Sequence, residues 1–288
     1  MKKPSLSLAF LASLTLCAAA VAATPPKPKA APPVTAETGS QRLTVPLSDP
    51  ARSGALHVNL IQGSISVKGT NRKDVLIEVR PRERGEDEEE DEKSPRAAGL
   101  RKISQPLAFT VEEESNRVEI SSSDPRRACD ITIEVPARID LNLSTINDGQ
   151  IQVEDVDGEH EISNVNGAIR LARVGGSVVA HTTNGAVNVT FTRVTPGKPM
   201  AFTTLNGAVD VSLPPATKAN LRLRSDQGQL FTDFDFTQQA VELKESKEPG
   251  GRTMKEIGKV IGGSINGGGP EFELRSFNGS VYVRKAGS

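Results

Sequence analysis

The residues of this 288-residue chain best suited to metal chemistry are three histidines and the acidic groups beside one of them. Glu159, His160 and Glu161 are consecutive, and adjacent strands could bring His181 close to them. His57 stands alone, and no two histidines have the close spacing of a zinc site. We therefore expect histidines on polar strand faces, with no metal site and no cofactor.

A second set with chemical potential is the acidic cluster Glu154, Asp155 and Asp157. In a polysaccharide-degrading β-helix, paired carboxylates a few ångströms apart perform acid–base catalysis. A carbohydrate-active enzyme with a cleft around Asp155 to Glu161 is therefore one alternative function. Here the carboxylates alternate along a strand and its turn, which favours exposed side chains. No Gly-x-Ser-x-Gly motif is present, and we expect no catalytic residues.

Charge and composition narrow the possible partners. The formal net charge is −1, and the aromatic residues are nine Phe, one Tyr and no Trp, so nothing favours nucleic-acid binding. Residues 81–102 form a predicted disordered, charged insertion whose acidic run, Glu86 to Glu92, is more typical of a solvated loop than of a calcium site. Cys129 is the one thiol expected to remain in the mature chain.

The N-terminus has the pattern of a secretory signal peptide over residues 1–23. Lys2 and Lys3 precede an apolar stretch, and cleavage is expected near Ala22-Ala23. Residues 24–40 form a Pro-rich linker ahead of a β-repeat domain at 41–288. No membrane span is expected after leader removal, and the predicted location is secreted, periplasmic or cell-envelope. An uncleaved anchor and lipidation of Cys17 remain alternatives.

The elements expected to position any site are short strands. Apolar residues alternate with polar ones between 41 and 80 and between 109 and 135, and turn residues separate these runs. From residue 140 the pattern becomes a repeat of about 20 residues. Residues two and four after a repeated glycine are mostly apolar, as in Ile151 and Val153 or Ile169 and Leu171. The pattern therefore predicts that each unit consists of a strand, a polar corner, a glycine turn and a second strand.

Units of this kind predict a β-solenoid, because one unit cannot bury its apolar face alone and stacked copies can. Equivalent corner residues would then lie above one another. Asn166, Asn184 and Asn206 are expected to bond amide to amide. Asn and Gly both tolerate positive φ, which predicts a positive φ at the Asn-Gly corners. The predicted structural turn ladder comprises Gly149, Asn166, Gly167, Asn184, Gly185, Asn206, Gly207, Gly228, Asn278 and Gly279.

The predicted fold class is thus all-β: a single-stranded β-solenoid or β-helix-like repeat with an irregular N-terminal cap. The alternative is an antiparallel β-sandwich, because Asn-Gly is also the strongest hairpin signal. The irregular region 41–135 and the closing VYVRKAGS are the candidate caps that a solenoid needs.

The copies SNVNGAIRLARV, TTNGAVNVTF, TTLNGAVDVSL and the closing SFNGSVYV resemble the bacterial adhesin-like β-strand-repeat family, a domain family of unknown function. The resemblance covers residues 140–288 well and 50–80 more loosely. It implies an exported or envelope-facing β-solenoid, and some relatives are tied to envelope-stress responses. It implies no catalytic residues.

The leading functional prediction is an exported, non-enzymatic, adhesin-like protein of the cell envelope that binds or scaffolds an unknown envelope or extracellular partner, protein or polysaccharide. Its outward side chains would make a flat ladder suited to extended partners: Arg170, Asn188, Asp210, Phe231 and Tyr282. An envelope-stress sensor that binds a regulatory partner is a further alternative. The oligomeric state is left open.

Overall fold

The computed structural model describes residues 35–37, 40–82, 109–122, 127–147, 149–239, 246–247, 253–254 and 260–287, and all regular secondary structure in them is β-strand. The predicted signal peptide, most of the linker and most of the 81–102 insertion lie outside these residues, as does Asp148. Among the described residues, no helix has the length and apolar character needed to cross a membrane.

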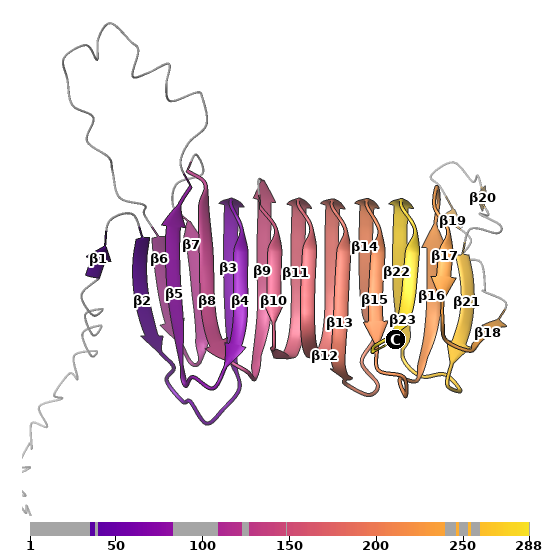
Figure 1. Cartoon of the computed structure of the whole chain (residues 1–288), viewed down its shortest axis with the longest axis horizontal. Coiled ribbons are helices and arrows are strands. Elements are labelled where there is room, and N and C mark those ends of the chain that lie inside the picture. Colours follow the sequence, from indigo (N-terminus) through magenta and orange to yellow (C-terminus); the bar gives the residue numbers. More distant parts are fainter. Residues whose placement is uncertain are drawn as a thin grey trace, which may run out of the picture. The chain divides into compact units, whose positions relative to one another are not determined.

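Two layers of strands pack face to face along a stack of coils (Figure 1). The first layer contains, in spatial order, β6 (Phe109–Glu114), β7 (Arg117–Ser122), β3 (Gly54–Gln62), β9 (Ile139–Asn147), β11 (Asp157–Asn166), the second half of β12 (Ile169–Asn184), β14 (Met200–Asn206), β22 (Glu271–Asn278), β16 (Ala219–Ser225), β21 (Val260–Ile265) and β18 (Phe236–Gln239).

The second layer contains, in the same direction, β1 (Thr35–Glu37), β2 (Ser40–Pro46), β5 (Asp74–Pro81), β8 (Cys129–Pro136), β4 (Ile65–Thr70), β10 (Ile151–Glu154), the first half of β12, β13 (Val187–Val194), β15 (Val209–Leu213), β23 (Val281–Lys285) and β17 (Leu230–Thr232). Two short strands, β19 (Ser246–Lys247) and β20 (Thr253–Met254), pair separately. β12 passes through both layers, so the layers are continuous at a corner.

Period-2 alternation fills the space between the layers, because successive side chains of a strand point to opposite faces. Ile151 pairs with Ile169, Ile169 with Val187, and Val187 with Val209, and all four are buried in the core. Equivalent residues of successive coils are therefore neighbours, as the repeat predicts.

The central strands are paired in parallel, which is the arrangement of a solenoid and not of hairpins. From β7 to β16 in the first layer and from β8 to β17 in the second, the pairings are parallel. Antiparallel strands occur toward the two ends. The β-solenoid prediction is confirmed, and the antiparallel sandwich is not needed.

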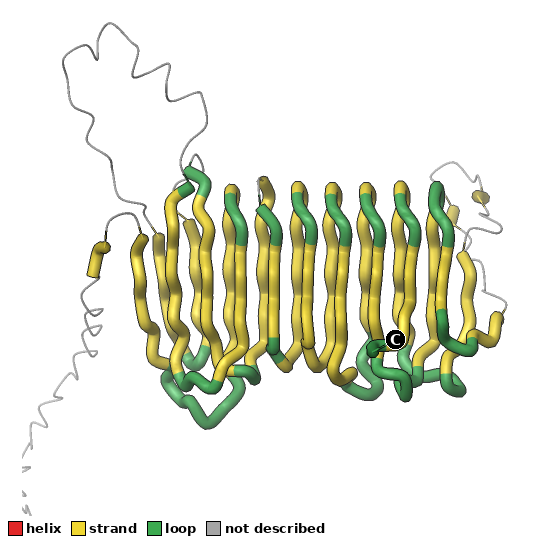
Figure 2. The backbone as a smooth tube through the Cα atoms, viewed as in Figure 1, coloured by secondary structure: helices red, strands yellow, loops and turns green. Residues whose placement is uncertain are grey.

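The order of the coils differs from their order in the sequence, as the labels and sequence colours of Figure 1 show; Figure 2 shows the same stack as strands joined by loops. The last coil, β22–β23, lies between β14–β15 and β16–β17, because Phe202 pairs with Leu274 and Leu223 pairs with the same Leu274. The prediction that the closing VYVRKAGS forms a cap is therefore wrong. The C-terminal coil is internal, and β16–β17 with the antiparallel β21 and β18 finishes that end.

The N-terminal end of the stack also contains a coil whose position differs from its order in the sequence. β3–β4 lies between β7–β8 and β9–β10, although it precedes both in the sequence. β2, β5 and β6 pair antiparallel outside these coils. Only part of region 41–135 is thus an irregular cap, since β3–β4 and β7–β8 are regular coils of the stack.

Candidate functional site

An outward row of side chains follows the second layer and is called here the outer ladder. Arg170 pairs with Asn188, Asn188 with Asp210, and Asp210 with Tyr282, which in turn pairs with Phe231. The structure therefore brings together all five residues that the sequence pattern placed on an outward surface. Phe231 follows Tyr282 in space although it precedes it by 51 positions in the sequence, because β23 is inserted before β17.

Aromatic and charged contacts organise one end of the outer ladder. The Phe231 and Tyr282 rings stack with centroids 5.0 Å apart and planes within 7°. The Arg284 guanidinium lies 4.9 Å from the centroid of the Tyr282 ring and bonds Asp210 through Nε, 3.0 Å from Oδ1. The Phe231 side chain is exposed. This end offers a flat aromatic stack beside a paired cation and anion.

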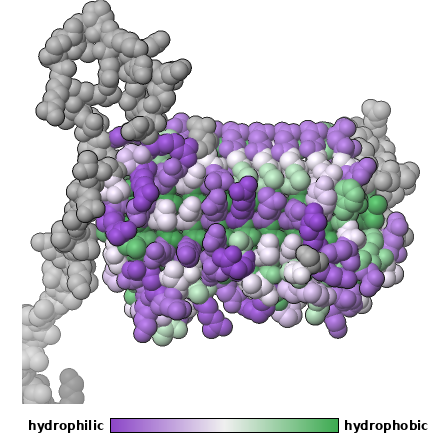
Figure 3. Space-filling model, in the orientation of Figure 1, coloured by the Kyte–Doolittle hydropathy of each residue, from purple (hydrophilic) through white to green (hydrophobic). Residues whose placement is uncertain are grey.

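The corner residues form a continuous chain of amides, called here the Asn ladder. In each pair the Nδ2 of one Asn donates to the Oδ1 of the Asn in the preceding coil, at 2.6–2.8 Å. A hydrophilic row runs along this edge of the stack in Figure 3. The residues, in spatial order, are Asn147, Asn166, Asn184, Asn206 and Asn278. Of the predicted turn ladder, the structure thus joins all four asparagines and extends them by Asn147.

Close approach of neighbouring coils explains the glycines at these corners. A Cβ on Gly149 would lie 1.8 Å from the carbonyl oxygen of Gly63, and a Cβ on Gly185 would lie 2.3 Å from that of Gly167. Gly228 stands against Gly279 in the same way. Among the turn-ladder glycines only Gly207 has a strongly positive φ, +152°. The prediction of a positive φ at the Asn-Gly corners is therefore wrong for most coils.

The polar residues three before each glycine, or four before it in the case of Thr145, are buried apart from the half-buried Ser225, although the sequence pattern placed them at a polar corner. Each donates from its side chain to a glycine carbonyl of the preceding coil, at 2.7–3.0 Å. Buried polar groups must find such partners. The donors are Thr145, Asn164, Thr182, Thr204, Ser276 and Ser225. The repeat pattern indicates that these positions are polar, but it does not indicate that they face the interior.

The acidic cluster proposed for catalysis is engaged in ion pairs at the second corner of the coils. Asp155 accepts two hydrogen bonds from Arg173, at 2.7 and 2.8 Å, and Arg193 bonds Asp157. The contact with Arg173 lowers the pKa of Asp155. A general acid needs a raised pKa, so this geometry does not favour the carbohydrate-active alternative.

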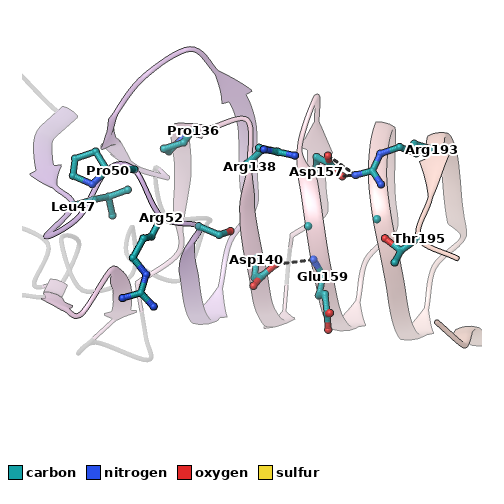
Figure 4. A pocket seen from close by; sticks show the side chains of 14 residues that line it. Leu47, Pro50, Arg52, Pro136, Arg138, Asp140, Asp157, Glu159, Arg193 and Thr195 are labelled. Carbon is teal, nitrogen blue, oxygen red and sulfur yellow. Dashed lines mark hydrogen bonds and ion pairs between the residues drawn. The ribbon is translucent and has the colours of Figure 1, made fainter. Parts of the chain in front are cut away.

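A shallow hollow of about 420 Å³ lies beside these ion pairs (Figure 4). Loop residues such as Pro50 and Arg52 line one side, and Arg193, Asp140 and Glu159 line the other. Asp140 accepts the backbone N–H of Glu159 at 2.8 Å. Its acidic groups hold the corners of neighbouring coils together, and they do not converge on a free centre.

Strand alternation separates the histidines that could have bound a metal. His160 points into the core, whereas His181 is exposed and contacts Thr203 Oγ1 at 2.6 Å. Glu159 and Glu161 are not buried with His160. Within the described ranges no group of three or more His, Cys, Asp or Glu residues could hold a metal ion.

Two further features that could suggest chemistry, the thiol of Cys129 and a glycine-rich segment, have structural roles. Cys129 is fully buried, and burial raises the pKa of its thiol to about 11, so it is not a reactive thiolate. The glycine-rich Gly262-Gly263-Ser264 lies in β21, where it pairs antiparallel with β16 and forms no phosphate loop. The acidic run 86–92 lies outside the described residues.

Burial of His160 predicts an acid-sensitive stability. Its side chain is 3 % exposed between Leu141 and Val178, and burial lowers its pKa against the opposing effects of Gly175, Val156, Asp140 and Asp157. The unfolded chain then binds a proton below pH ~6.5 that the folded chain resists. Stability is therefore complete above that pH and falls as the pH drops.

We expect the free energy of unfolding to decrease by up to about 1.4 kcal/mol per pH unit below pH ~6.5 from this one proton. Urea denaturation between pH 7.5 and 5, in steps of about half a unit, measures it. His160→Val, which repeats the residue type of Val178, should flatten this dependence. An equally steep dependence in the variant would contradict it.

Together these features define a class of protein: a parallel β-solenoid of two-strand coils whose corners are held by asparagine amides and whose ends are closed by antiparallel strands. The model of the family Toastrack DUF4097 matches residues 34–258. The chain belongs to this family. The match ends before β22 and β23, the coil that lies inside the stack.

Solved structures that match the chain do so at low sequence identity. A "putative cell adhesion protein" from Clostridium sporogenes is 11% identical, covers 85% of this chain and 99% of its own, and has a TM-score of 0.39. A "putative adhesin" from Bacteroides fragilis is 10% identical, with coverages of 86% and 98% and a TM-score of 0.30. At these TM-scores, nothing about the function of this chain is inferred from either structure. The search of curated proteins found no match.

Proposed function

We propose that this chain is an exported, non-enzymatic, adhesin-like protein of the cell envelope, and that it binds or scaffolds a partner through the outer ladder. The observation that carries the proposal is the alignment of Arg170, Asn188, Asp210, Tyr282 and Phe231 along one outward row. The strands that carry these residues lie ~4.8 Å apart, so the row presents charged, amide and aromatic groups at a regular spacing.

The rigidity of the row supports binding, because preorganised side chains lose little conformational entropy when a partner docks. Tyr282 is fixed between Phe231 and Arg284, and Arg284 is held by Asp210. Tyr and Arg are also the residue types most enriched at the energetic centres of interfaces. Export is supported by the N-terminal leader pattern in the sequence.

The test compares binding of the purified mature chain to intact cells and envelope fractions. The double variant Phe231→Ala/Tyr282→Ala should bind at least about tenfold more weakly, because truncation of an anchoring aromatic residue costs over 1 kcal/mol. Val179→Ala, on an exposed position of the other layer, is the matched control. Wild-type binding that the double variant retains in full would remove the outer ladder from the proposal.

A further inference from the structure

An exposed row of large apolar side chains runs along the first layer, next to the Asn ladder, and is called here the apolar ridge. Five of the seven exposed large apolar residues in the described part of the chain belong to it, each 36–45 % exposed. They occupy the position just before the corner Asn or Gln of their coils. The ridge consists of Ile61, Ile146, Val165, Leu205 and Phe277.

Register places these residues side by side. Ile61 and Ile146 lie between the paired positions Leu60–Thr145 and Gln62–Asn147. The same spacing sets Leu205 beside Phe277, between the pairs Thr204–Ser276 and Asn206–Asn278. Thr183 occupies the one polar position, between Val165 and Leu205. The ridge is therefore one side chain wide and six coils long.

The surroundings of the ridge are mostly uncharged. On one side lies the Asn ladder, and on the other lie, in spatial order, Asn59, Ser144, Ser163, His181 and Thr203. The cations Arg275 and Arg224 follow only at the far end, where Arg224 pairs with Asp226. From Asn166 onward, each ladder Asn uses one N–H to donate to the Asn amide of the preceding coil. An amide has two N–H groups and two acceptor lone pairs, so each coil keeps a donor and an acceptor for a ligand.

We propose that the apolar ridge and the Asn ladder together bind an extended, uncharged polysaccharide. Hydroxyl groups both donate and accept hydrogen bonds, as the remaining amide groups do, and the apolar C–H faces of sugar rings match a ridge of aliphatic side chains. The repeat also fits, because coils follow at ~4.8 Å and a sugar ring in an extended chain advances by a similar length. Each contact is weak, and several coils acting on one chain supply the affinity.

Other occupants fit this surface less well. A second copy would need about 800 Å² per partner for a standard interface, and one row of half-exposed side chains does not supply it. An anionic membrane surface would require basic residues along the ridge, and the ridge itself has none. An added β-strand would need a free edge, whereas these strands are paired on both sides.

The test measures retention of the purified mature chain on cellulose and chitin, with alginate as an anionic polysaccharide. Retention on at least one neutral polysaccharide is expected, and it should persist in about 1 M NaCl, where the Debye length is about 3 Å. The double variant Val165→Glu/Leu205→Glu should lower the affinity at least about tenfold. Val179→Glu, an equally exposed apolar position outside the ridge, is the matched control and should stay within about twofold.

Thr183→Val provides a gain-of-function variant, because it completes the apolar row, and it should strengthen binding. Thermal unfolding of each variant establishes that it is folded. Three results would overturn the proposal: no retention on either neutral polysaccharide, equal losses in the ridge and Val179 variants, or retention on alginate alone that salt abolishes. None of these three results involves Phe231 or Tyr282. The function proposed for the outer ladder is therefore tested independently, by the Phe231→Ala/Tyr282→Ala variant.

Discussion

Deletion of residues 271–287 is expected to unfold the whole domain and not merely to shorten it. The deleted coil, β22–β23, fills the slot between β14–β15 and β16–β17, so its loss leaves two strand edges unpaired in each layer. It also removes Phe272, Leu274, Val281 and Val283, which are 0–1 % exposed. Each such side chain contributes about 1.5–3 kcal/mol, so the four account for ~6–12 kcal/mol.

That loss is comparable to the whole stability of a typical domain, about 5–15 kcal/mol. Circular dichroism during heating, with urea denaturation, measures it on the purified chain. Deletion of residues 286–288 alone, beyond β23, is the control and should melt close to the wild type. A shortened chain that lost β22–β23 and kept a cooperative transition near the wild-type temperature would show that this coil is a cap, as its place in the sequence suggests.

The sequence identified the coils but not their order. The alternation around Gly167 and Gly185 specifies which side chains face the core, because a one-residue slip would expose the entire apolar set. Every coil, however, offers the same apolar face and the same Asn-Gly corner to its neighbours. A coil with Asn278 fits beside Asn206 as well as a coil with Asn184 does, so the likeness that reveals the repeat leaves the position of each copy undetermined.

The ends of the stack show why the inserted order is physically favourable. A solenoid that stopped at a regular coil would present open strand edges that can pair with other chains. Here the chain first forms the coil at the end of the stack, β16–β17, and the antiparallel strands β18 and β21 beyond it. It then returns to insert the C-terminal coil, β22–β23, which pairs with β14 and β16 in one layer and with β15 and β17 in the other. Such pairings join residues distant in sequence, and hydrophobic periodicity carries no information about them.

The sequence likewise predicts one part of the candidate binding surfaces, and the rest depends on the order of the coils. The outer ladder followed from alternation alone, since Arg170 and Asn188 occupy equivalent positions in the aligned copies. The stacking of Phe231 on Tyr282 depends on the inserted coil and could not be predicted. In the sequence, the apolar ridge is present as Val165, Leu205 and Phe277, each just before a corner Asn. The sequence alone does not predict a binding surface there, because single exposed apolar residues are ordinary and only the register aligns them in a row.

Gly167→Ala is expected to destabilise the fold by more than about 3 kcal/mol, the second large effect that the geometry predicts. The added Cβ would lie 1.8 Å from the carbonyl oxygen of Gly149, so the backbones of two coils must separate. The same Gly149 oxygen accepts a hydrogen bond from Asn164 Nδ2 at 2.9 Å. The Gly167 carbonyl oxygen in turn accepts one from Thr182 Oγ1 of the next coil, also at 2.9 Å. A shift at one corner therefore disturbs hydrogen bonds on both sides of it.

A control separates this clash from ordinary backbone strain. Gly197 has φ of +77° and nothing within 4 Å of a Cβ, so Gly197→Ala meets only the cost of a left-handed conformation, about 1–2 kcal/mol. Urea denaturation of both variants gives the two free-energy differences directly. Gly167 has no such positive φ, so a larger loss at Gly167 than at Gly197 can come only from contact between coils. Equal losses would mean that the coils do not approach one another at the Asn-Gly corners as closely as the solenoid requires.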